Sequence, residues 1–313
     1  MPVLTVVLAL LAALANGAAS ALQRRAALQQ EEEEEGAGHG LRGRLRHLLE
    51  LVRRPFWAAG MAALVVSGAL QASALAVGAL SVVQPLMATE LLFTLMAGSL
   101  AFARRPDAGT WLWFLALAGG LALFLGAARP SGGEAQALPG TWPRTAVPLA
   151  LLVLVLWLVG RALSGGARAC VLGCATAVCF ACTAALIKDV TGLVPDGLPR
   201  VFASWQLYAA GAVGLLSLLL LQVTLRAGSL AASQPALTIG DAVVSVALGW
   251  VLFEERIALG AHVVPEAAGV VLMAAGAVGL SRSPAVAGGW DVPRGHGPGT
   301  ARDRHRPVHG GPR

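Results

Sequence analysis

Residues 78–105 read GALSVVQPLMATELLFTLMAGSLAFARR, and residues 228–256 read GSLAASQPALTIGDAVVSVALGWVLFEER. Both stretches start with Gly, have Gln-Pro at their seventh and eighth positions and end in a cluster of charged residues. Between these ends each stretch is mostly apolar and contains one acidic residue, Glu90 in the first and Asp241 in the second. A long apolar segment with an internal acid, present twice, predicts a duplicated membrane-spanning unit.

The composition of the whole chain indicates the same class of protein. Of the 313 residues, 56% are hydrophobic and only 13% are charged, which is more apolar surface than one soluble core can bury. Apolar runs of about 20 residues, the length that a spanning helix needs, recur from end to end of the chain. We therefore expect an all-α polytopic membrane protein that contacts membrane lipid and has no soluble domain.

The apolar runs predict nine transmembrane helices, at residues 3–22, 57–78, 79–103, 109–128, 146–163, 168–187, 202–223, 229–253 and 262–280. Most of the 23 Lys and Arg residues then fall on one side, which is expected to be cytoplasmic. This places the N-terminus outside and the C-terminus inside. The pI near 10.1 thus reflects topology and contact with anionic lipid, and no nucleic-acid partner is expected. A composition rich in Ala, Gly and Arg, with Lys188 as its single lysine, favours a bacterial plasma membrane.

The first apolar run has two interpretations. Ala18-Ala19-Ser20-Ala21 resembles a signal-peptide cleavage site, but the positive charges Arg24-Arg25 follow the run instead of preceding it, so we expect a retained helix. The loop at 23–56 contains the acidic run Glu31–Glu35 and then LRGRLRHLLELVRR. It is predicted to be a solvated cytoplasmic loop, and its basic part has the spacing of an interfacial helix.

The cysteines and the C-terminal histidines do not indicate a metal or redox centre. All four cysteines lie in one predicted span, and although Cys179 and Cys182 have CxxC spacing, we expect them to be free packing residues. Residues 282–313 lack apolar periodicity and are predicted to be a disordered tail, whose histidines have no metal-ligand spacing. No cofactor is expected.

The duplicated stretches are the third and eighth predicted spans, so they cross the membrane in opposite directions. Four spans, one connecting helix at 146–163 and four further spans are the simplest description of the chain. The predicted parts are a first repeat at 1–130, a connector at 131–167, a second repeat at 168–281 and the tail at 282–313. Inverted repeats of this kind are typical of secondary transporters, whose substrate sites lie near the midplane between the repeats.

At this level the chain resembles the drug/metabolite transporter superfamily, whose EamA-type repeats have a proline early in one helix and an acid at that helix's end. Pro85 and Pro235 match the first feature, and Glu254-Glu255 matches the second in the C-terminal half. Arg104-Arg105 takes the place of the acid in the N-terminal half. Nine spans and the basic sequence Gln23-Arg24-Arg25 resemble the branch of the NIPA-type magnesium transporters. The resemblance implies a fold of two inverted repeats and a transport function.

The acids within the spans are the main functional candidates, because an ionisable group near the bilayer midplane costs a few kcal/mol. On a helix, Asp241 shares one face with Gln234, Thr238 and Ser245. The predicted substrate- or ion-binding residues are Glu90, Asp241, Gln234, Thr238, Ser245, Gln84 and Asn16. The structural alternative is that each acid is protonated and hydrogen-bonded to a neighbouring helix. Pro85 and Pro235 predict either exposed backbone carbonyls or simple kinks.

The sequence favours a transporter, and not an enzyme, that moves a small metabolite, drug or cation by alternating access. A homodimer is the assembly considered for it. Passage of a divalent cation such as magnesium is the alternative, supported by an acidic mouth at Glu254, Glu255, His262 and Glu266, which are otherwise interfacial residues. An intramembrane hydrolase using Gly240-Asp241 and a non-transporting scaffold or sensor are the remaining alternatives.

Overall fold

The computed structural model describes residues 3–34, 55–101, 107–128, 133–227, 230–256 and 263–282, and no strand occurs among them. Eight of its helices are long and apolar enough to cross a membrane. These are α1 (Val3–Glu34), α3 (Pro55–Val77), α6 (Ala108–Ala128), α7 (Thr141–Ala162), α8 (Gly165–Gly192), α10 (Trp205–Ala227), α11 (Leu230–Phe253) and α12 (Val263–Arg282). The expectation of an all-α polytopic membrane protein is therefore confirmed. The tail, the basic stretch after Glu35, and Arg104-Arg105 lie outside the described residues.

The third predicted span is divided into two helices, α4 (Leu80–Met87) and α5 (Glu90–Ala101). The prediction of one continuous helix over 79–103 was therefore wrong. The junction lies one turn after Pro85, and its backbone bonds are tight: Ala88 N–H donates to Pro85 O at 3.2 Å and Thr89 N–H to Leu86 O at 3.0 Å. The Thr89 hydroxyl also donates to Leu86 O, at 2.6 Å, and competes with the helical pattern. The break places Glu90 at the first position of α5.

The structure also defines the end of the first helix and the connection between α8 and α10. The helix α1 continues to Glu34, although its apolar membrane-spanning part ends at Gln23. Its extension is rich in Ala, Gln and Glu, which favour helix. The short helices η1 (Val194–Asp196) and α9 (Leu198–Ala203) connect α8 to α10. All four cysteines lie along α8 and are free, as expected.

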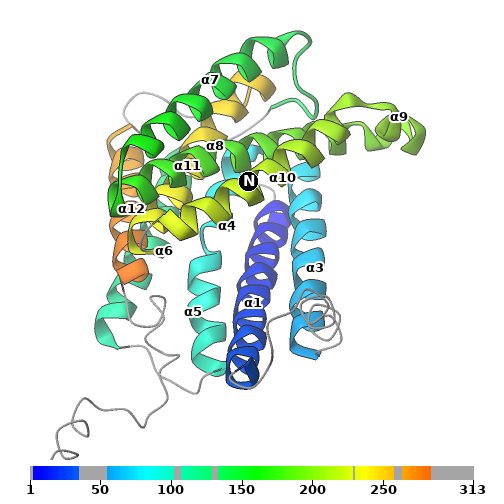
Figure 1. The fold of residues 1–313 in the computed structure, drawn as a ribbon. Helices are drawn as coiled ribbons and strands as arrows, with labels where there is room; N and C mark the ends of the chain where they lie inside the picture. The colour runs from blue at the N-terminus through cyan, green and yellow to red at the C-terminus, as the bar shows by residue number, and fades with distance from the viewer. Residues whose placement is uncertain are drawn as a thin grey trace, which may run out of the picture.

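The helices of the two sequence halves pack in corresponding ways. In the first half α1 packs against α3 and α5, and in the second half α8 packs against α10 and α11. Figure 1 shows α1, α3 and α5 side by side. Across the halves, α6 pairs with α12, and α4 packs against both α11 and α8. This arrangement packs α4 of one half, which leads into α5, against α11 of the other.

Glycines allow α6 and α12 to approach closely. A Cβ added at Gly269 would lie 2.7 Å from the backbone nitrogen of Phe124, and one at Gly276 would lie 2.7 Å from Cα of Leu117. Real Cβ atoms are essentially never found so close to backbone. The pair is thus an example of small-residue packing between membrane helices.

Candidate functional site

The fold brings together three of the predicted site residues, from α1, α5 and α11. The Asn16 side-chain amide donates a hydrogen bond to the Glu90 carboxylate. The carboxylates of Glu90 and Asp241 are close enough to interact electrostatically. Gly17 permits this approach, since a Cβ there would lie 2.7 Å from the backbone nitrogen of Thr94 in α5. We name Asn16, Glu90 and Asp241 the acid-pair site.

One side of the acid-pair site has an unsatisfied acceptor. The Asp241 Oδ1 atom is buried and has no hydrogen-bond partner among the described residues, and the same holds for the Ser245 hydroxyl one turn further along α11. An unpartnered buried polar atom is costly, so native proteins usually supply a proton, a water, an ion or a ligand. These two oxygens are therefore positions where a bound proton or cation would add a favourable interaction.

The other predicted residues lie in α11 and in α4. Thr238 is buried and Gln234 half-buried in α11, on the face predicted for the polar stripe. Gln84 in α4 is buried and accepts a hydrogen bond from the Gln71 amide of α3 at 3.3 Å. A small apolar cavity of about 110 Å³ lies between α4, α6, α11 and α12 and is lined in part by Pro85 and Ala242. Apolar surface therefore adjoins α11 next to Asp241.

A second group of buried charges lies at the end of the bundle where Gly78 lies. The sequence prediction for this group was wrong. Glu255 was predicted to be an interfacial acid of a cation-attracting mouth, but its side chain is 0% exposed and pairs with Lys188 Nζ at 2.9 Å. The Lys188 ammonium also donates to Gly78 O at 2.9 Å and lies 4.9 Å from the centre of the Phe253 ring. We name this pair and its partners the Lys188–Glu255 cluster.

The end of α11 explains how Glu255 reaches that position. Glu254 has a left-handed φ of 52°, and Glu255 N–H donates to the carbonyl oxygen of Gly249, six residues earlier, at 3.0 Å. This turn directs the chain back towards the helix. Gly249 leaves room for the carboxylate, because a Cβ at that position would meet Glu255 Oε2. A helix end that looked exposed in the sequence thus folds inwards.

Asp189, the residue after Lys188, fixes the connector to α8 and was missed in the sequence. It is 2% exposed and accepts hydrogen bonds from Ala137 N–H at 2.9 Å and from Trp142 Nε1–H at 2.8 Å. The Gln206 amide adds a longer bond of 3.4 Å. Its position at the end of an apolar run gave no indication of these partners, which are distant in sequence.

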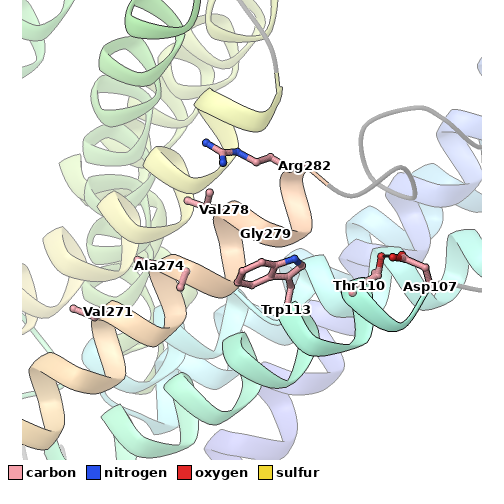
Figure 2. Close-up of a pocket in the computed structure, with 10 residues that line it drawn as sticks. Asp107, Thr110, Trp113, Val271, Ala274, Val278, Gly279 and Arg282 are labelled. Carbon is pink, nitrogen blue, oxygen red and sulfur yellow. Dashed lines mark hydrogen bonds between the residues drawn. The ribbon is translucent and has the colours of Figure 1, made fainter.

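A larger pocket of about 640 Å³ lies between the ends of α6 and α12 (Figure 2). Trp113 and Val278 line its apolar part, with Asp107 on the α6 side and Arg282 on the α12 side. None of the predicted site residues lines it. The candidate site therefore remains the acid-pair site in the interior.

Asp107 at the start of α6 gives a pH-dependent prediction. The Thr110 hydroxyl donates to the Asp107 carboxylate and lowers the pKa of that group below its usual value. A lowered folded-state pKa stabilises the protein above the unfolded-state pKa, about 3.9, and this contribution disappears as the pH falls through the folded value. Asp107→Asn should lower the melting temperature slightly at neutral pH, and the difference from wild type should shrink as the pH falls below about 3.9. A difference that stays constant over this range would contradict the assignment.

The helices, their apolar lengths and the buried charges define a polytopic α-helical membrane protein. The chain is 29% identical over 216 residues to an uncharacterized protein of Corynebacterium glutamicum, and the aligned region covers 67% of this chain and 73% of that protein. No family model matches the chain, and no solved structure matches it.

Proposed function

We propose that this protein is a secondary transporter in which the acid-pair site binds the transported or coupled cation. The observation that carries the proposal is that Glu90 and Asp241, one from each half of the chain, lie within the helical bundle in electrostatic range of each other. Two neighbouring carboxylates in an apolar interior are unfavourable when both are charged, so a proton or cation shared between them is stabilised. Acids of this kind within membrane helices commonly belong to ion or proton pathways.

The residues of the site have distinct roles in this proposal. Asn16 donates to Glu90 and orients its carboxylate. The free Oδ1 of Asp241 and the Ser245 hydroxyl remain available to the ion. Since α5 and α11 belong to opposite halves, a relative movement of the halves would change the distance between the acids, and hence the affinity for the ion. This gives alternating access a physical coupling to binding.

The resemblance to the drug/metabolite transporter superfamily supports a small metabolite or drug as substrate, with a proton as the coupled ion. The alternative is a divalent cation, as in the NIPA-type branch. Two carboxylates favour this alternative chemically, because magnesium often keeps its waters and uses only one or two protein carboxylates. The plasma membrane and the orientation with the N-terminus outside belong to the same proposal.

Transport by the purified protein in proteoliposomes tests the proposal. Glu90→Gln and Asp241→Asn, which keep the shape of each side chain and remove its charge, should each reduce pH-driven or magnesium flux at least about tenfold. Asp196→Asn, at an exposed site with an i,i+4 partner in Arg200, is the matched control and should leave flux unchanged.

Flux of a proton-coupled organic cation and flux of magnesium are measured separately, so that the two substrate classes are distinguished. Full, still pH-dependent flux in both acid variants would exclude the acid-pair site from the mechanism. Absence of flux for both substrate classes in the wild type would contradict the transporter itself.

A further inference from the structure

The Lys188–Glu255 cluster joins the two halves of the chain at a single point. Glu255 comes from the end of α11 and Lys188 from α8, both in the second half. The Glu255 carboxylate accepts hydrogen bonds from two N–H groups at the start of α4, in the first half: Leu80 N–H to Oε1 at 2.6 Å and Ser81 N–H to Oε2 at 2.9 Å. One carboxylate thus neutralises Lys188 and caps the N-terminus of α4.

The helix that Glu255 caps leads directly to the acid-pair site. All eight residues of α4 are buried. The helix ends at Met87, and the tight turn at Ala88 and Thr89 connects it to Glu90. A displacement at the start of such a short, buried helix is transmitted to its other end. Glu255 and Glu90 therefore lie at the two ends of one short segment, α4 and the turn that follows it.

The connector covers the cluster from its remaining side. Glu134 N–H donates to Phe253 O at 2.7 Å, and Leu138 N–H donates to Leu252 O at 3.0 Å. Gly133 lies directly over Glu255, since a Cβ there would lie 2.7 Å from Glu255 Cγ. Asp189 holds the next part of the same segment through Ala137. At this end of the bundle, α4, α8, α11 and the connector are closed against one another around one ion pair.

We propose that the Lys188–Glu255 pair is the closed gate at the Gly78 end of the bundle and that Glu255 is a positioning residue for Glu90. This inference rests on the proposed transporter function. Separation of the pair frees the start of α4 and the connector, opens this end to water and moves Glu90 away from its partner Asn16. Because the same carboxylate closes the gate and caps α4, opening and ion release are one event.

The gate is tested by thiol labelling, which needs no substrate. In a chain whose four cysteines are replaced by alanine, Ser81→Cys provides a probe at the cap; Ser81 is 0% exposed and its hydroxyl has no partner among the described residues, so cysteine fits there. Glu255→Gln should raise the rate of maleimide labelling at this probe at least about tenfold. Asp196→Asn, in the exposed ion pair with Arg200, should leave the rate unchanged.

A second probe separates opening of the gate from general loosening. Native Cys179, retained alone in a parallel chain, is buried in α8 at 3% exposure and should label at the wild-type rate in the Glu255→Gln variant. If Glu255→Gln does not fold, Glu255→Asp keeps the charge but shortens the reach to α4, and it should raise labelling at the Ser81→Cys probe in the same way.

Unchanged labelling at the Ser81→Cys probe, or a parallel rise at Cys179, would overturn the gate. Neither result depends on transport, so the gate can fail while the transporter stands. Conversely, a wild type without flux but with selective labelling at the probe would overturn only the proposed function.

Discussion

Replacing Lys188 by methionine is expected to lower the free energy of unfolding by about 3–5 kcal/mol. The substitution leaves the Glu255 carboxylate, whose side chain is 0% exposed, without its counter-charge at 2.9 Å. The two N–H groups of α4 still bond to that carboxylate but do not neutralise its charge. Methionine keeps the contact with Phe253, so loss of charge is the main change. Reversible unfolding in detergent mixtures, followed by circular dichroism, measures the difference.

The exposed pair Arg200–Asp196 supplies the control for this result. Its atoms are 3.3 Å apart and its side chains are 67% and 39% exposed, so Arg200→Met should change the same free energy by less than about 1 kcal/mol. If both substitutions lowered the free energy of unfolding by similar amounts, burial of the Lys188–Glu255 pair would not determine its contribution to stability. An additional Glu255→Gln change in the Lys188→Met chain should recover part of the lost stability, because the uncompensated charge is then removed.

The transmembrane architecture could be predicted because it depends on local properties of the sequence. Runs of about 20 apolar residues located the long helices, since the bilayer imposes that length on any spanning helix. The acids Glu90 and Asp241 stood out for the same reason: each interrupts such a run. The duplicated Gln-Pro stretches also indicated which helices from the two halves correspond, and the structure packs α4 against α11.

The partners of the charged residues could not be predicted, because they are remote in sequence. Glu255 and Lys188 are 67 residues apart, and Glu255 and Leu80 are 175 apart. At the end of an apolar run Glu255 looked like an ordinary interfacial charge. Only the turn at Glu254, a left-handed residue that is not glycine, brings Glu255 inside. Nothing in the local pattern specifies that turn.

The sequence pattern also did not predict that one proline-containing helix is continuous and the other is broken. Pro85 and Pro235 each follow a glutamine, yet α11 continues through Pro235, whereas the first copy breaks one turn after Pro85. Thr89 stands at the break, and Ile239 stands at the aligned position of α11, where no hydroxyl competes for a backbone carbonyl. The broken copy is the one capped by Glu255.

The pairing of α6 with α12 leads to a prediction in which one substitution has opposite effects at two glycines. Gly276→Ala should lower the free energy of unfolding by about 1–3 kcal/mol, because the new methyl group would lie 2.7 Å from Leu117 Cα and neither backbone can yield without separating the helices. Gly126→Ala in α6, where a Cβ would meet nothing within 4 Å, should raise it by up to about 1 kcal/mol, since alanine favours helix over glycine.

Both variants are measured by the same unfolding assay, and the sign of the change is the decisive result. Helix propensity alone would make both substitutions stabilising, so a destabilised Gly276→Ala protein shows that close packing outweighs propensity at this contact. If Gly276→Ala were as stable as Gly126→Ala, the two helices would have to lie further apart than the structure places them. The cross-half contact between α6 and α12 would then not rest on glycine packing, and the two halves would be held together chiefly by α4, α11 and the Lys188–Glu255 cluster.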